Sequence, residues 1–159
     1  MDVKDFTVIA RSALMEAQNY ALTHSNPSLT DLHLLFALLK NDTTSLPKLL
    51  NRSGVDLMKL MHSVSEAQET LPEIKSETTE IKLQVDQLLA KILAKAGQWA
   101  KQRGDSFIAS DALLLAMAES NGVAGKLLKK HNLNIPTLKK EIETLRQGRK
   151  IDSDSGEEL

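Results

Sequence analysis

The apolar residues of this chain recur at helical spacing, and the same apolar pattern occurs twice. Residues 6 to about 60 and 85 to about 138 carry it, displaced by 78 to 80 positions. A repeat of this length predicts a pseudo-twofold domain of two copies rather than a solenoid of many short units. At an offset of 79, one stripe in each copy aligns: Phe6, Ala10, Leu14, Ala17 and Ala21 with Val85, Leu89, Leu93, Ala96 and Ala100.

The first copy predicts four helices because apolar residues recur in steps of three and four. Asp5 is the expected N-cap of the first helix and Thr30 of the second. The second helix is apolar on most sides, which is typical of a central, buried helix. Gly54 suits a left-handed end of the third helix. We expect the four helices over 5–22, 31–39, 47–52 and 56–70.

The second copy repeats this plan after a polar connector at 71–82. Ser110 is the expected N-cap of its second helix, and Asn132 falls where the first copy has Gly54. Because Asn is second only to Gly in the left-handed conformation, both copies are expected to end their third helix in the same way. The helices are expected over 85–100, 111–117, 123–130 and 136–146.

The pattern therefore predicts an all-α fold of eight helices in two repeats of four, stacked back to back. The aromatic content of 3% agrees with a helical core of Leu, Ala, Ile, Val and Met. Beyond residue 147 the chain becomes acidic and loses its apolar period, which is typical of a flexible segment. We expect a domain over 1–148, with repeats at about 5–70 and 83–147, and the start of a flexible linker over 149–159.

Composition and motifs exclude several kinds of chemistry. The chain has no cysteine, and its four histidines lack the spacing of metal ligands. His33, in an apolar helix, is expected to be a hydrogen-bonded core residue. Neither a nucleophile-elbow motif nor a phosphate-binding loop occurs in the 159 residues. No apolar run approaches the roughly 20 residues that span a bilayer, so we expect no membrane partner.

The C-terminal quarter is basic although the formal net charge is only −1. A nucleic-acid surface is one interpretation of this cluster. The neutral total charge and the lack of aromatic residues for base stacking favour a solvated helix face instead. The residues concerned are Lys126, Lys129, Lys130, Lys139, Lys140, Arg146, Arg149 and Lys150.

Three short segments carry a resemblance to a known family. They are Phe6-Thr7, Leu32-His33-Leu34-Leu35 and Arg103-Gly104-Asp105-Ser106-Phe107-Ile108. In this order, and within two repeats of four helices, they resemble the amino-terminal domain of the Clp family of AAA+ unfoldases. The turn at 103–108 looks most like the protein-disaggregating branch of that family. The resemblance covers roughly residues 5–148.

The resemblance implies that the parent protein continues with two ATPase modules and a coiled-coil middle domain. ATP and magnesium would then belong to those modules, and this chain would hold no cofactor, no metal and no catalytic residue. The resemblance also implies a cytoplasmic location, a hexameric parent protein and a monomeric isolated domain.

The resemblance further implies a substrate-contacting surface near the start of the first helix and the turn before the sixth. The matching positions are Thr7, Asp105 and Asp111. Each also has a purely structural interpretation, as a first-turn residue, a turn residue bonded to local amides or a carboxylate at a helix N-terminus. Phe107 and Ile108 could close the core or form the floor of a shallow apolar groove with acidic edges.

Three functions follow from these observations. The first is recognition of unfolded or aggregated polypeptide for delivery to the motor of a disaggregating chaperone. The second is binding of a folded adaptor by a protease-linked unfoldase of the same family. The third, from another class, is nucleic-acid binding by the basic helices.

Overall fold

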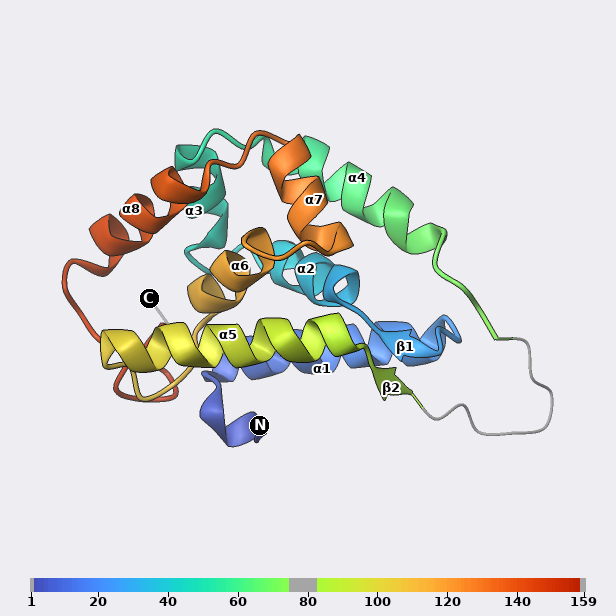
Figure 1. Cartoon of the computed structure of the whole chain (residues 1–159), viewed down its shortest axis with the longest axis horizontal. Helices are drawn as coiled ribbons and strands as arrows, with labels where there is room; N and C mark the ends of the chain where they lie inside the picture. The colour runs from blue at the N-terminus through green and yellow to red at the C-terminus, as the bar shows by residue number, and fades with distance from the viewer. Residues whose placement is uncertain (1, 75–82, 158–159) are drawn as a thin grey trace.

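The computed structural model describes residues 2–74 and 83–157 and confirms an all-helical fold (Figure 1). A short 3-10 turn, Val3–Asp5, precedes the first helix, and two two-residue strands, β1 (Ser28–Leu29) and β2 (Gln84–Val85), lie between helices. The described residues form eight α-helices, α1 Val8–Thr23, α2 Asp31–Lys40, α3 Leu46–Arg52, α4 Leu57–Glu69, α5 Gln87–Arg103, α6 Ser110–Ala118, α7 Val123–Lys130 and α8 Ile135–Arg146.

The short strands join the two copies to each other. β1 pairs in parallel with β2, with Leu29 opposite Val85, and an isolated parallel bridge joins Phe6 to Ile108. Both pairs obey the 79-residue offset, because Val85 corresponds to Phe6 and Ile108 to Leu29. The segment before the first helix of each copy therefore pairs with the segment before the second helix of the other.

These pairs correct the prediction for both first helices. Phe6 and Val85 stand at the start of the apolar stripes, but both lie in extended backbone outside the helices. Thr7, not Asp5, is the N-cap of α1, and Asp5 instead closes a capping box with Asp2. Burial breaks the symmetry here, because Phe6 is in the core and Val85 is exposed.

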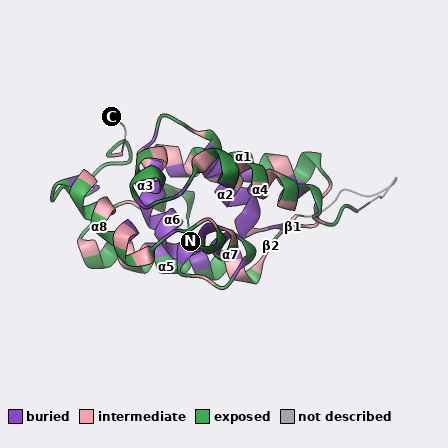
Figure 2. Ribbon diagram, turned by 90° about the horizontal axis from the view of Figure 1, so that it is seen from above, coloured by how far each residue is buried: buried purple, intermediate pink, exposed green. Residues whose placement is uncertain are grey.

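The helices also cross between copies, so that the copies interlock rather than stack back to back. α2 and α6 lie at the centre, between α1 and α5 (Figure 2). α3 of the first copy packs against α8 of the second, and α7 of the second packs against α4 of the first (Figure 1). One continuous core of buried side chains runs through both copies.

The third helix of each copy ends as predicted. Gly54 and Asn132 adopt left-handed backbone, with φ of 87° and 72°. In each case the amide of the next residue, Val55 or Leu133, bonds back to the carbonyl of Leu50 or Leu128. Three other helix starts also agree with prediction, since Thr30, Asp56 and the segment before Val123 lie where expected, whereas Ala109 rather than Ser110 is the N-cap of α6.

Two segments, 71–82 and 149–159, were predicted to lack helix, and the structure describes only the second of them in most of its length. Most of the predicted connector, 75–82, lies outside the described residues. The predicted flexible segment, 149–159, is described as far as residue 157, and it packs back on the helices with Ile151 buried. The domain boundary at 148 and the repeat bounds stay a prediction.

Candidate functional site

The five predicted site residues lie together around the starts of α1 and α6. The Thr7 amide donates to the Ile108 carbonyl at 3.0 Å, and the Thr7 hydroxyl accepts from the Ala10 amide at 3.1 Å. Thr7 and Ile108 are buried, whereas Phe107 is half-buried. Ile108 therefore belongs to the core, as its bridge to Phe6 requires.

The two predicted aspartates share one buried partner, Arg146 at the end of α8. Arg146 binds both oxygens of Asp111, at 2.8 and 2.7 Å, and one oxygen of Asp105 at 2.7 Å. Its guanidinium also lies 5.4 Å from the centre of the Trp99 ring. Burial alone would lower the pKa of Arg146, but the hydrogen bonds and charges of the two carboxylates outweigh it and raise that pKa.

This ion cluster corrects the prediction of a solvated basic face at the position of Arg146. The acidic side chains expected to edge a groove are instead neutralised by an arginine that is 6% exposed. The sequence contains a signal for this, because Arg146 follows Leu138 and Ile142 at steps of four and so lies on the inward stripe of α8.

The C-terminal segment 151–157 covers the predicted site. The amide of Ser106 donates to the carbonyl of Ile151 at 2.7 Å, and the amide of Ile151 donates to Asp105 at 2.9 Å. Further along, the Val8 amide donates to the Asp154 carbonyl at 2.8 Å, and the Asp154 carboxylate pairs with Arg11 at 2.9 Å.

Glu157 completes this contact at the N-terminus of α6. Its carboxylate accepts hydrogen bonds from the Thr7 hydroxyl and from the Ser110 amide, the latter at 3.0 Å. Burial raises the pKa of Glu157, its hydrogen bonds from Thr7 and Ser110 lower it, and the nearby charge of Asp111 raises it, with a net rise. The ionised carboxylate is therefore held less firmly than its hydrogen bonds alone suggest.

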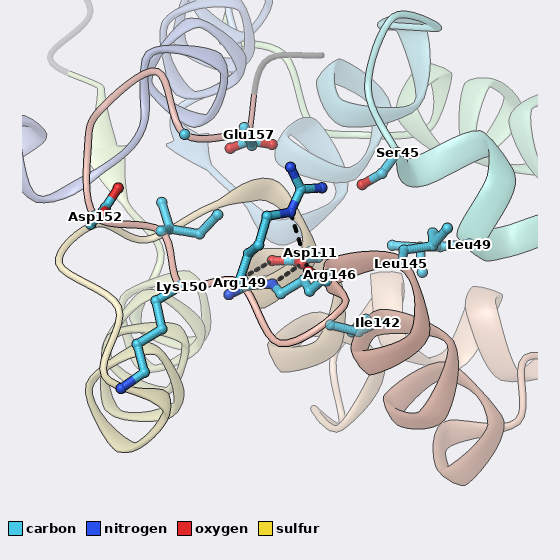
Figure 3. A pocket seen from close by; sticks show the side chains of 12 residues that line it. Ser45, Leu49, Asp111, Ile142, Leu145, Arg146, Arg149, Lys150, Asp152 and Glu157 are labelled. Atoms are coloured by element: carbon cyan, nitrogen blue, oxygen red, sulfur yellow. Dashed lines mark hydrogen bonds and ion pairs between the residues drawn. The ribbon is translucent and has the colours of Figure 1, made fainter.

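Beside this cluster lies a pocket of about 660 Å³ between α3, α6, α8 and the C-terminal segment (Figure 3). Leu49, Ile142 and Leu145 form an apolar side, and Glu157 lies on the other side of Asp111 and Arg146. Phe107 does not line this pocket, which is lined in addition by Ser45, Arg149, Lys150, Ile151, Asp152 and Gly156.

The pocket arises where the two copies differ. In the first copy Asp31, the counterpart of Asp111, accepts a hydrogen bond from the Ala124 amide of α7 at 2.9 Å. This close approach requires Gly122, because a Cβ there would lie 2.4 Å from the Asp31 carboxylate. The position equivalent to Gly122 holds Thr44, whose own hydroxyl accepts from the Leu46 amide at the start of α3. Asp111 is thereby free to bind Arg146, and space remains beside α3.

Several residues of this site escaped prediction. Nothing in the sequence indicated that Leu145 would line a pocket. Glu157 lies in an acidic, Ser- and Gly-containing segment whose composition predicts a flexible linker. Its contact depends on residues about 50 and 150 positions away, which no local pattern records.

Within residues 2–74 and 83–157, no cluster of histidine and carboxylate side chains is suited to hold a metal ion. None of the helices in those ranges has the length and apolarity to cross a bilayer.

Eight helices in two interlocked copies, with a pocket beside a corner where the copies differ, are the architecture of a Clp-type amino-terminal domain. The sequence profile described as the Clp repeat (R) N-terminal domain matches residues 5–154. The chain belongs to this family.

Known relatives agree with this assignment. The chaperone protein ClpB of Pseudomonas putida is 32% identical over 158 residues, which are 99% of this chain and 18% of that protein. The Hsp104 N-terminal domain of Candida albicans has a TM-score of 0.84 and 25% identity, covering 96% of this chain and 99% of that one. A ClpV N-domain solved in complex with a VipB peptide has a TM-score of 0.72 and 17% identity, covering 92% and 89%. This chain thus spans about a fifth of the length of the ClpB relative that it matches.

Proposed function

We propose that this domain binds unfolded or aggregated polypeptide and passes it to the AAA+ motor of a ClpB-like chaperone for disaggregation under stress. The observation that carries the proposal is the 32% identity to a ClpB protein across nearly the whole chain. The motor, its ATP and magnesium, a hexameric assembly and a cytoplasmic location belong to the same proposal, because the chain spans only 18% of that relative.

The pocket beside α8 suits such a ligand. An unfolded chain exposes apolar side chains next to polar backbone, and the pocket offers the half-buried Leu145, backed by the buried Leu49 and Ile142, next to charged groups. Its volume of about 660 Å³ holds a few side chains rather than a folded surface. Weak binding suffices, because a tethered domain raises the effective concentration of the segment at the motor to about millimolar.

A second candidate is recognition of a defined partner protein, as in the adaptor-binding domain of a protease-linked unfoldase. The ClpV N-domain, which shares this fold, was solved with a bound peptide of VipB. A domain of this kind would bind one partner tightly and unrelated unfolded chains poorly. The nucleic-acid alternative is weakened because Arg146, one of its basic residues, is buried in an ion pair.

The test is a titration of the 159-residue chain with fluorescently labelled α-lactalbumin that has been reduced and carboxymethylated, so that it stays unfolded. Native α-lactalbumin is the control ligand. We expect saturable binding to the unfolded form alone. Leu145→Ala should weaken this binding by roughly three- to tenfold, the effect of about 1 kcal/mol of lost apolar contact. Met58→Ala, an equal apolar truncation at an exposed position of α4 outside the pocket, should leave the affinity unchanged.

The titration separates the three functions. Absence of binding to unfolded α-lactalbumin at millimolar concentration would contradict the proposal. Tight binding to one folded protein, with none to unfolded chains, would establish the adaptor-binding function instead. Binding to DNA that weakens steeply with salt would establish the third. Phe107→Ala, measured in the same titration, tests the contact predicted from the family resemblance.

A further inference from the structure

The C-terminal segment 151–157 contacts the starts of α1 and α6 as a bound peptide would. It uses backbone groups, since Ser106 and Val8 donate to its carbonyls at 2.7 and 2.8 Å. It also uses side chains at every third position. Ile151 is buried, Asp154 pairs with Arg11, and Glu157 accepts from Thr7 and Ser110.

This spacing defines a chemical pattern. An apolar side chain is followed by one carboxylate three positions later and a second carboxylate six positions later. The groups that bind the second carboxylate, that of Glu157, are fixed in place. The Ser110 amide is at the N-terminus of α6, where the helix dipole favours an anion. The Thr7 hydroxyl is held by its cap bond to Ala10.

The receptor has more binding capacity than its occupant uses. Arg149 lines the adjoining pocket, and no ion pair joins it to a carboxylate of the described residues. A ligand with a further acidic group would find in Arg149 a partner that segment 151–157 leaves free.

The occupant also stands between the receptor and the pocket. Gly156 and Glu157 form part of the pocket lining, as does Ile151. When the segment leaves, the pocket and the groups at the start of α6 form one continuous surface. A longer ligand could then place an apolar residue against Leu145 and its carboxylate on the Ser110 amide.

We propose that the starts of α1 and α6 form a receptor for acidic peptide segments with an apolar residue three positions before the first carboxylate, and that residues 151–157 are its built-in competitor. This inference rests on the proposed function and names the class of client segment that the domain prefers. A client must displace the segment, so only segments that combine apolar and acidic groups compete well.

The experiment releases the competitor and supplies it again as a separate peptide. Asp154→Asn and Glu157→Gln are combined in the 159-residue chain, which removes both carboxylates and changes no side-chain volume appreciably. The probe is a fluorescein-labelled peptide with the sequence of residues 150–157, KIDSDSGE, and its binding is followed by anisotropy. A second peptide carries Asn and Gln in place of the same two acids.

We expect the double variant to bind the acidic peptide roughly tenfold more tightly than the unaltered chain, because a tethered competitor acts at an effective concentration of about millimolar. The Asn- and Gln-containing peptide should bind at least tenfold more weakly than the acidic one. Asp42→Asn is the matched control, since it removes an exposed carboxylate that makes no ion pair with a described residue and lies outside both the pocket and the C-terminal segment. Circular dichroism at 222 nm verifies that each variant is folded.

Equal affinity of the acidic peptide for both forms of the chain, or none for either, would overturn the inference. The titration with unfolded α-lactalbumin then tells the two proposals apart. If unfolded α-lactalbumin still binds, the acidic receptor is wrong and the proposed function stands. If it does not, the proposed function has failed as well.

Discussion

Arg146 is the side chain that organises the candidate site. It joins the turn before α6, through Asp105, to the first turn of α6, through Asp111, and it does so from the last turn of α8. Buried carboxylates are tolerated only when they are paired and hydrogen-bonded. The residue identities could be predicted from the family resemblance, but the pairing could not, because it depends on how α8 docks.

Replacing Arg146 by Met should lower the free energy of unfolding by about 3–5 kcal/mol, because two buried carboxylates lose their charged partner. Urea denaturation followed by circular dichroism measures the change. Arg149→Met is the control, since Arg149 has no carboxylate partner among the described residues, and it should change stability by less than about 1 kcal/mol.

A second set of variants tests the cause. Adding Asp105→Asn and Asp111→Asn to Arg146→Met removes the orphaned charges, so most of the lost stability should return. If the triple variant is as unstable as Arg146→Met alone, then packing of the arginine side chain, and not its charge, supports this corner of the fold.

His33 was predicted to be a hydrogen-bonded core residue, and the structure confirms it. Its Nδ1 accepts from the Thr30 amide at 2.9 Å, so Nε2 carries the proton and donates to Asn26 at 3.0 Å. Burial, and then the charge of His24, lower the pKa of His33 from 6.5 to about 4. Only the neutral ring can make both bonds.

This shift makes stability depend on pH. Because the unfolded chain binds the proton more readily, stability is full above pH 6.5 and falls as the pH drops towards 4. The loss from this group should be about 2 kcal/mol by pH 5. His33→Gln should remove that part of the pH dependence, whereas His62→Gln, at an exposed position, should retain it. An NMR titration in which the His33 ring protonates near pH 6.5 would contradict this account.

At the scale of helices, the sequence predicted where helices end better than it predicted which helices pack together. Gly54 and Asn132 indicate where α3 and α7 end, because few other residues adopt the left-handed backbone conformation at a low energetic cost. No comparable sequence signal shows that α3 packs against α8 and α4 against α7. An apolar stripe states that a helix is covered on one face but not which helix covers it, and the two-residue strands are too short to show alternation.

Gly122 fixes one of these exchanged contacts, between α2 and the start of α7. A Cβ at this position would lie 2.3 Å from Leu88 and 2.4 Å from the Asp31 carboxylate, which the Ala124 amide holds in place. Gly122→Ala should therefore cost about 1–3 kcal/mol of stability through overpacking. Asn121→Ala, at the exposed neighbouring position, should have little effect. A stable Gly122→Ala variant would show that α7 can shift without loss, and the difference between copies would then not explain the pocket.

At the scale of the molecule, one continuous core of buried side chains runs through both interlocking copies. The extended pairs Phe6–Ile108 and Leu29–Val85 and the packing of α3 on α8 and of α4 on α7 all join one copy to the other. The sequence predicted the number of helices and the duplication, yet the same pattern is compatible with stacked copies. Only the structure shows that helices of one copy pack against helices of the other.

This arrangement predicts a single unfolding transition. Trp99, the one tryptophan, lies in α5 of the second copy, so its fluorescence reports that copy, whereas circular dichroism at 222 nm reports all helices. The two urea curves should coincide. Leu35→Ala, in α2 of the first copy, should shift the Trp99 curve by the full 2–5 kcal/mol expected for a large core truncation. A Trp99 curve unmoved by Leu35→Ala would mean that the copies unfold independently.

Each contact between the copies joins two segments whose equivalents are both present in either copy, at an offset of 78 to 80 residues. In a protein with only one repeat, these segments would have no partner within the molecule, but a second identical molecule could supply all the partners. The two copies in this one chain are therefore arranged as the two subunits of a twofold-symmetric dimer would be. Because both copies belong to one chain, equivalent positions can hold different residues, as Thr44 and Gly122 do, and the two corners then differ in shape.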